Sequence, residues 1–301
     1  MKNKFLLVLF FVAIILFQAC KEEPPYINFE PDKGISDTTY IISPVPAAEQ
    51  KVTLIEEFSG VRCVNCPAGQ LTAKTIAEKY PNRVNIVTIH PLNKFNSLTK
   101  PFDVATGSEV TSLYDFRTDP GAKILDMVGY GITGSLPMGN INRKLFSGET
   151  ARNIDYQKWS GYVDQEINLP TPVNIKLNAK NIANEVEIEI TLTYTELVTD
   201  SQYITISILE SEMEDAQEGK DANGNSKIFE NYIHNHVLRA LVTGFYGDYL
   251  KGTYEPGRVF YKKYRIKRDA KWNAANLDVL AMVHLNTTKK NVLHSKEVKV
   301  N

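Results

Sequence analysis

Lys51-Val-Thr-Leu-Ile-Glu-Glu-Phe58 and Cys63-Val-Asn-Cys66 are the two runs of sequence that most restrict the fold of this chain. The first run is apolar and rich in β-branched residues, which predicts a buried strand. The region from Cys63 to about Tyr80 predicts a helix, because good helix formers surround an apolar stripe that includes Leu71. Arg83–His90 is again apolar and β-branched. The sequence therefore predicts a strand, a cysteine pair, a helix and a second strand, in that order.

The spacing of Cys63 and Cys66 suits redox chemistry better than simple cross-linking. A disulfide that closes a loop of four residues contributes roughly 1.9 kcal/mol in the chain-entropy model, against about 3 kcal/mol for a loop of fifteen. Two intervening residues instead place one thiol at the start of the helix and its partner one turn further in. The helix dipole and the free N–H groups then favour the thiolate of Cys63. A CxxC pair between a strand and a helix is typical of thioredoxin-like folds.

Two further positions resemble functional residues of thioredoxin relatives. Glu57 lies six residues before Cys63, where thioredoxins carry a buried acid that helps to deprotonate the second cysteine. Pro137, in the sequence Ser-Leu-Pro-Met, resembles the cis-proline that faces the disulfide. The alternatives are that Glu57 is a solvated carboxylate at the end of a strand and that Pro137 is an ordinary trans-proline in a loop. The resemblance implies a catalytic set made of Cys63, Cys66, Glu57 and Pro137.

The N-terminus has the anatomy of a lipoprotein signal. Lys2 and Lys4 precede an unbroken apolar run, Phe5–Phe17, which is shorter than the roughly 20 residues that a transmembrane helix needs. The run ends just before Cys20, so residues 1–19 are expected to be the signal peptide. The thiol of Cys20 would then carry fatty acyl chains such as palmitate and anchor the mature protein to a lipid bilayer. An ordinary cleaved signal followed by a chance cysteine is the alternative.

Three stretches resemble the signature of the outer-membrane-protein-28-related lipoproteins of the Bacteroidota. They are Glu56–Gly69 around the cysteine pair, Leu136–Arg143 around the proline, and His234–Ala240. Lys21-Glu22-Glu23 resembles the signal that sends some lipoproteins of these bacteria to the cell surface. The resemblance implies a lipid-anchored protein of the outer membrane, displayed at the cell surface in one interpretation, with a thioredoxin-like module and a β-rich C-terminal module.

The expected fold class is α/β followed by all-β. After the signal peptide we expect a lipidated tether at 20–50, which leads into a thioredoxin-like domain at 51–168 and a β-sandwich domain of the immunoglobulin type at 169–301. The first domain is expected to contain a helical insert and a closing helix, at Ser108–Tyr114, Ala122–Val128 and Asp155–Ile167. The second contains alternating or β-rich runs at Val173–Leu177, Glu185–Tyr194, Tyr203–Leu209, Tyr232–Thr243, Val259–Ile266, Leu277–Leu285 and Asn291–Val300.

The amino-acid composition and the charge balance argue against several classes of function. The chain has 301 residues, with 34 Lys and Arg against 35 Asp and Glu, and a formal net charge of −1. A nucleic-acid-binding protein needs a basic face, so we expect no nucleic-acid partner. His234 and His236 are expected to share one face of a strand, but no third ligand accompanies them. We therefore expect neither a metal nor a cofactor.

Two functional hypotheses remain open at this point. In the first, the lipoprotein is a thiol–disulfide oxidoreductase that acts on cysteine-containing envelope proteins. Cys63 attacks, Cys66 resolves the mixed disulfide, Glu57 carries the proton and Pro137 supports the substrate backbone. In the second, the protein is a non-catalytic binding or adhesion lipoprotein of the cell surface. Cys63 and Cys66 then form a structural disulfide, and the β-sandwich is the working part.

Overall fold

The computed structural model describes residues 34–131, 134–286 and 288–301. All of them belong to one compact unit, Lys33–Asn301. The predicted signal peptide, the predicted lipidation site Cys20 and the first part of the tether lie outside the described residues. Within the described ranges, no helix is both long enough and apolar enough to cross a membrane.

The strand–helix–strand order predicted around the cysteines is present. The predicted strands and helix are observed with only small shifts at their ends, because their periodicity is local. The elements of this half of the chain are β1 (Gly34–Ile41), β2 (Thr53–Phe58), α2 (Cys66–Lys79), β3 (Val84–Pro91), α3 (Asn96–Thr99), β4 (Arg117–Thr118), α4 (Asp119–Val128), β5 (Met138–Ile141) and α5 (Trp159–Glu166).

The rest of the chain is built from strands. They are β6 (Val173–Ile182), β7 (Glu185–Tyr194), β8 (Gln202–Glu210), β9 (Met213–Lys220), β10 (Ser226–His234), β11 (Val237–Leu241), β12 (Asp248–Tyr249), β13 (Arg258–Lys267), β14 (Leu277–Leu285) and β15 (Val292–Lys299). A four-stranded sheet has the order β1-β13-β7-β6. It packs face to face against β8, β14 and β15 around an apolar core that includes Ile190, Ile206 and Ala281.

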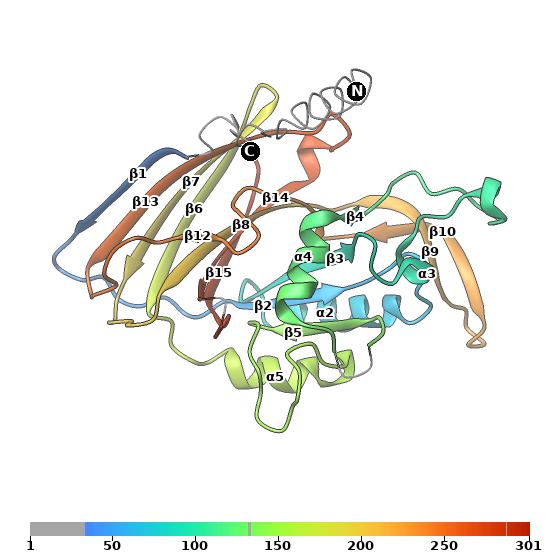
Figure 1. Cartoon of the computed structure of the whole chain (residues 1–301), viewed down its shortest axis with the longest axis horizontal. Coiled ribbons are helices and arrows are strands. Elements are labelled where there is room, and N and C mark those ends of the chain that lie inside the picture. The colour runs from blue at the N-terminus through green and yellow to red at the C-terminus, as the bar shows by residue number, and fades with distance from the viewer. Residues whose placement is uncertain (1–33, 132–133, 287) are drawn as a thin grey trace, which may run out of the picture. The chain divides into compact units, whose positions relative to one another are not determined.

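The expectation of a thioredoxin-like domain followed by a separate immunoglobulin-like sandwich is wrong. One sheet of nine strands runs through both regions in the order β15-β14-β8-β11-β3-β2-β5, with β12 beside β8 and β4 beside β3 (Figure 1). Strand β11 makes the connection, since it is antiparallel to β8 and parallel to β3, where Val237 pairs with Thr88. The strands around the cysteines therefore continue the sheet of the β-rich region. The boundary drawn at residue 168 stays a prediction.

The insert between β3 and β5 is also less helical than expected. Ala122–Val128 lies in α4, but Ser108–Tyr114 is irregular. A distant carboxylate explains the difference: the amides of Leu113 and Tyr114 donate to the two oxygens of Asp215, at 2.9 Å each. These hydrogen bonds replace those of a helix.

Helices cover both faces of the sheet near the cysteines. Helices α2 and α5 pack on one face, where Ile55, Ile76 and Trp159 share an apolar cluster. Helix α4 packs on the other face, against Leu54 and Phe58 (Figure 1). Because side chains alternate along a strand, Glu56 and Glu57 point to opposite faces of β2.

Gly139 in β5 gives a sharp test of this packing. A Cβ atom there would lie 2.5 Å from Cζ2 of Trp159 and 2.6 Å from the carbonyl oxygen of Glu56. We expect Gly139→Ala to lower the free energy of unfolding by about 2 kcal/mol, as overpacking does in other cores. At Gly161 in α5, a Cβ meets no atom within 4 Å, and Gly161→Ala is expected to stabilise the protein by about 0.5 kcal/mol. Urea denaturation of both variants checks the pair, and equal effects would contradict the packing described.

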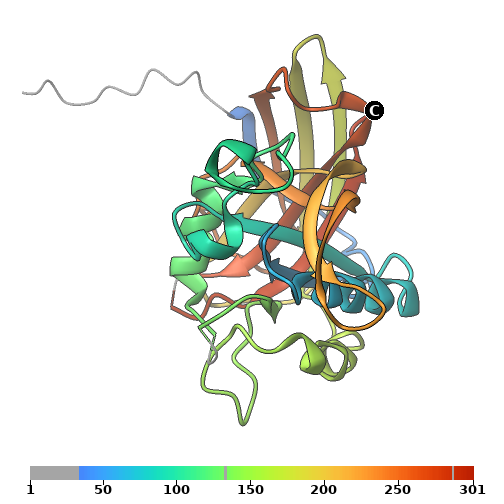
Figure 2. The ribbon, with the colours of Figure 1, turned by 90° about the vertical axis from the view of Figure 1, so that its right-hand side faces the viewer.

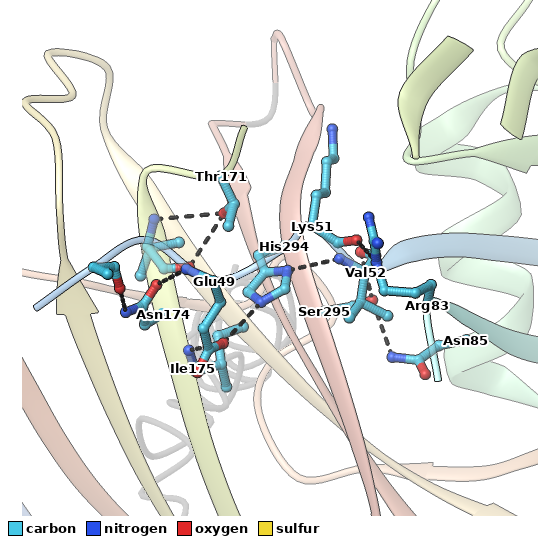
Figure 3. Close-up of polar contacts among 12 residues, drawn as sticks. Glu49, Lys51, Val52, Arg83, Asn85, Thr171, Asn174, Ile175, His294 and Ser295 are labelled. Carbon is cyan, nitrogen blue, oxygen red and sulfur yellow. Dashed lines mark hydrogen bonds and ion pairs between the residues drawn. The ribbon is translucent and has the colours of Figure 1, made fainter. Parts of the chain in front are cut away.

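The segment Glu49–Val52 joins the two regions (Figure 3). The amide of Glu49 donates to Oδ1 of Asn174, at 2.8 Å, and its carboxylate accepts from the amide of Ile175, at 3.3 Å. The amide of Val52 donates to Nδ1 of His294, at 3.1 Å, so this ring carries its proton on Nε2. That nitrogen lies 3.3 Å from the Glu49 carboxylate and donates to it. Four hydrogen bonds therefore fix the chain where it passes from β1 to β2.

Candidate functional site

The two cysteines form a disulfide at the end of β2. Cys63 lies in the turn after the strand, and Cys66 is the first residue of α2. Their Cα atoms are 5.3 Å apart. Cys63 is 2% exposed and Cys66 is 0% exposed, and both pack in an apolar cluster with Phe58 and Leu136. Solvent therefore has almost no access to the bridge.

Helix α2 begins one turn later than the sequence suggested. Pro67 lies in the first turn of the helix, where its fixed φ and missing N–H are tolerated. The amide of Cys66 donates to the carbonyl of Cys63, at 3.0 Å, in the turn that precedes the helix. Cys63 therefore lies two residues before the N-cap residue Asn65 and not in the first turn of α2. The predicted effect of the helix dipole on its thiolate stays a prediction.

A hairpin from the β-rich region covers the cysteine turn. It consists of β9 and β10, and it lies beside α2 in both ribbon views (Figures 1 and 2). Nε2 of Gln217 donates to the carbonyls of Gly60, at 3.1 Å, and Cys63, at 3.4 Å. The amide of Glu218 donates to the carbonyl of Val61, at 2.7 Å. The hairpin thus satisfies polar backbone groups of the turn and covers the turn that carries Cys63.

Glu57 and Pro137 meet beside the first turn of α2. A Cβ atom at Gly69 would lie 3.1 Å from Cβ of Pro137 and 3.5 Å from Oε1 of Glu57. The Leu136–Pro137 peptide bond is cis. The structure therefore brings the four predicted residues of the cysteine site into one region, although the roles assigned to them stay predictions.

The Glu57 carboxyl group is isolated inside the protein. Its side chain is 0% exposed, and neither oxygen has a hydrogen-bond partner among the described residues. Burial raises the pKa of Glu57 to about 8, because the charged form loses its hydration. At neutral pH this carboxyl group holds its proton in the folded protein. The alternative of a solvated carboxylate at the end of a strand does not apply.

An open groove of about 810 Å³ lies between α2 and the end of the hairpin. Glu57 forms part of its inner wall. The hydroxyl of Tyr232 donates to Oε1 of Gln70, at 2.5 Å, and so links the two walls. The groove is lined by Glu57, Gln70, Leu71, Lys74, Ala77, Glu78, Ile86, Thr88, Glu212, Tyr232, Ile233, Asn235 and His236. Sequence reasoning missed this groove because one of its walls comes from a distant hairpin.

The family of the chain follows from its C-terminal part. The sequence model of Outer membrane protein Omp28 matches residues 127–301, which is more than half of the chain. The chain belongs to the Omp28 family. The Omp28 match begins within α4 and continues to the last residue, so the two cysteines precede it. Membership of this family supports a location at the outer membrane and leaves the chemistry of the cysteines open.

Solved structures resemble this Omp28 family chain at low sequence identity. HBP35 of Porphyromonas gingivalis has a TM-score of 0.62 at 16% identity, over 85% of this chain and 77% of HBP35. A protein from Agrobacterium tumefaciens has a TM-score of 0.44 at 11% identity, over 85% of this chain and 97% of its own. The likeness to HBP35 shows the fold alone, and the second likeness carries no argument. No curated protein sequence matches that of this Omp28 family member.

The predicted histidine pair is separated in the structure. His236 has a φ of 53° and lies between β10 and β11, so the run expected as one strand forms two. His234 instead packs against Phe116 and His90, with ring centroids 4.5 Å from Phe116 and 6.3 Å from His90. Burial lowers the pKa of His234 to about 4 and that of His90 to about 3, so both are neutral near pH 7. Asn235 lies between the two histidines, and asparagine is common in turns, so this residue was the sequence signal for a break in the strand.

Proposed function

We propose that this member of the Omp28 family is a non-catalytic binding protein, held at the outer membrane by a lipid anchor and exposed to a partner. In this proposal Cys63 and Cys66 form a structural bridge and the groove beside α2 is the binding site. The observation that carries the proposal is the burial of the disulfide beneath β9 and β10.

Thiol–disulfide exchange needs direct access to a sulfur atom. An attacking thiolate must approach one sulfur in line with the bond that breaks. Here the sulfurs lie in an apolar cluster, and Gln217 and Glu218 hold the hairpin over the turn. An exchange partner would have to displace the hairpin first. A structural bridge has no such requirement, and its contribution of about 2 kcal/mol adds to that of the hairpin contacts.

The lipid anchor in the proposal rests on the sequence before the fold. Phe5–Phe17 and Cys20 have the order of a lipoprotein signal. Acyl chains contribute about 0.8 kcal/mol for each buried methylene group, so a multiply acylated Cys20 would hold the protein stably at a bilayer. A mature protein in which Cys20 carries no acyl chain would contradict the anchor and leave the binding site untouched.

The disulfide gives the decisive test. We expect no turnover in an insulin-reduction assay, and reduction of Cys63–Cys66 by dithiothreitol on the order of 100-fold slower in the native protein than in urea, because the hairpin must open first. A methyl group added at Gly219 would lie 3.2 Å from Cγ of Pro67 and 3.0 Å from Cε2 of Phe229, so Gly219→Ala is expected to loosen the cover and speed reduction. Gly161→Ala is the matched control.

Turnover of insulin by the wild-type protein would contradict the proposal. It would favour the second candidate, an oxidoreductase that acts on cysteine-containing envelope proteins. The observation on its side is that the disulfide, Glu57 and Pro137 lie together around Gly69. In that case a Cys66→Ser variant would accumulate mixed disulfides through Cys63, which mass spectrometry detects.

A further inference from the structure

The groove beside α2 contains a buried acid that no cation neutralises. Other buried carboxylates in the described part of the chain have partners: Glu56 pairs with Arg143, and Glu166 pairs with Lys51 and Lys144. Glu57 has none, although it is fully buried and forms part of the groove wall. An unpaired buried acid inside an open groove suits a ligand that brings the missing donor.

We propose that the groove binds an ammonium group on an apolar stem, as in a lysine side chain, with Glu57 as its counter-ion. This inference rests on the proposed binding function and names the class of ligand. Three features of the groove support it: its oxygen atoms, its apolar walls and the charges around it.

The inner end of the groove offers oxygen atoms to an ammonium group. An ammonium has three N–H donors and no acceptor. Oε1 of Gln70 and the hydroxyl oxygen of Tyr232 are already 2.5 Å apart, and both residues line the groove with Glu57. Burial, and to a smaller extent the Glu57 carboxyl, raises the pKa of Tyr232 to about 12, so this hydroxyl keeps its proton near neutral pH. Together with the Glu57 carboxyl group, these two side chains give the groove oxygen acceptors that an ammonium group can use.

Apolar side chains form the outer part of the groove. Leu71 on α2 is 64% exposed, and Ile233 on β10 is 40% exposed. Leu71 belongs to the apolar stripe of the predicted helix, and in the structure it lies outside the core. With Ala77 and Ile86 they give the two walls an apolar surface on the path to Glu57. A chain of methylene groups would cover this surface, whereas a short hydrated cation would leave it exposed.

The charges around Glu57 favour a cation. Lys74 and Glu78 of α2 line the groove; both side chains are exposed, and Nζ of Lys74 lies 3.9 Å from Oε1 of Glu78. Glu212 and His236 line it near the hairpin, and Nδ1 of His236 lies 3.6 Å from Oε1 of Glu297. Once Glu57 is ionised, the three acids that line the groove outnumber its cations, whether or not His236 is charged.

Binding is coupled to the release of one proton. The free protein holds Glu57 as a neutral acid, and the bound state pairs the ammonium with the Glu57 carboxylate. The O–H bond of the acid breaks, and its proton passes to the buffer. No electron transfer and no other reactant are involved. Affinity must therefore rise with pH until Glu57 ionises in the free protein.

Isothermal titration of the whole soluble chain tests the inference. The probe is Nα-acetyl-lysine methylamide, and Nα-acetyl-norleucine methylamide is the matched probe without the amine. We expect the lysine probe to bind more tightly, with an affinity that rises about tenfold between pH 6 and pH 7. Titrations in buffers of different ionisation enthalpy are expected to show the release of nearly one proton at pH 6.

Two variants separate Glu57 from its neighbours. Glu57→Gln removes the counter-ion and is expected to lower the affinity for the lysine probe by at least about tenfold and to abolish proton release. His236→Gln removes the other group that titrates near neutral pH and is expected to keep the pH dependence. Circular dichroism checks that both variants are folded.

Equal binding of the two probes, absence of binding, or a pH-independent affinity would overturn the inference. So would unchanged binding by Glu57→Gln. These outcomes leave the proposed function standing as long as the disulfide resists reduction and insulin is not turned over. Insulin turnover, in contrast, would overturn the proposed function whatever the groove binds.

Discussion

Glu57→Gln is expected to stabilise the protein relative to the wild type by an amount that grows with pH and reaches about 3 kcal/mol near pH 7. Burial raises the pKa of Glu57 to about 8 in the folded protein, from an ordinary value of 4.5. Between these pH values the unfolded chain releases the proton and the folded chain keeps it. The wild type therefore loses stability as the pH rises from about 4.5 to 8, whereas glutamine does not titrate.

The measurement is urea denaturation of both proteins from pH 3 to pH 8. Glu49→Gln is a control of opposite sign, because the hydrogen bond from His294 holds the pKa of Glu49 below its ordinary value. The stabilisation from Glu49 is complete above its ordinary pKa of 4.5 and is lost as the pH falls below that value, so this variant is expected to fall further behind the wild type as the pH rises from 3 to about 5. A constant difference between wild type and Glu57→Gln would show that the carboxyl group is solvated.

Arg143→Met is expected to lower the free energy of unfolding by about 3–5 kcal/mol, because it leaves a buried carboxylate without its cation. Nε and Nη2 of Arg143 donate to Glu56, at 2.8 and 2.5 Å, and both side chains are almost completely buried. Without the guanidinium, Glu56 keeps one side-chain donor among the described residues, Nδ2 of Asn140 at 3.2 Å. Chemical denaturation at neutral pH measures the loss.

The same substitution at Arg265 is the matched control. Arg265 pairs with Glu187, which also contacts Lys180 and Lys263, so its loss leaves that carboxylate paired. Arg265→Met is expected to cost less than about 1 kcal/mol, because Arg265 itself is exposed and the two lysines remain paired with Glu187. Adding Glu56→Gln to Arg143→Met is expected to recover part of the loss, since no buried charge remains. Equal losses for the two arginine variants would refute the importance of the Glu56–Arg143 pair.

The local part of the fold was predictable and the long-range part was not. The residues of β2, α2 and β3 carry their own hydrophobic periodicity, and the sequence placed them to within a few residues. The contact between Val237 and Thr88 joins strands that are far apart in the chain and leaves no periodic signal. The expectation of a thioredoxin-like sheet separate from the β-sandwich is wrong because this contact joins the two regions in one sheet. The helix expected at Ser108–Tyr114 is absent for a related reason, because the distant carboxylate of Asp215 accepts hydrogen bonds from the amides of Leu113 and Tyr114.

The candidate site was also predictable only in its local part. The cysteine pair, Glu57 and Pro137 were found from their spacing and from resemblance, and the structure brings them together around Gly69. The cover over the disulfide was missed because Met213–Lys220 is acidic and does not alternate, so it does not read as a strand. Its inner contacts are made to backbone carbonyls and to Pro67. Burial of the sulfurs therefore could not be deduced from the sequence near them.

The hairpin that covers the disulfide also sets an order of maturation. Gln217 lies 154 residues after Cys63. Protein chains are made from the N-terminus, so both thiols exist long before the segment that encloses them. We therefore expect the disulfide to form before the hairpin docks on the cysteine turn, and to be protected from reductants once it has docked.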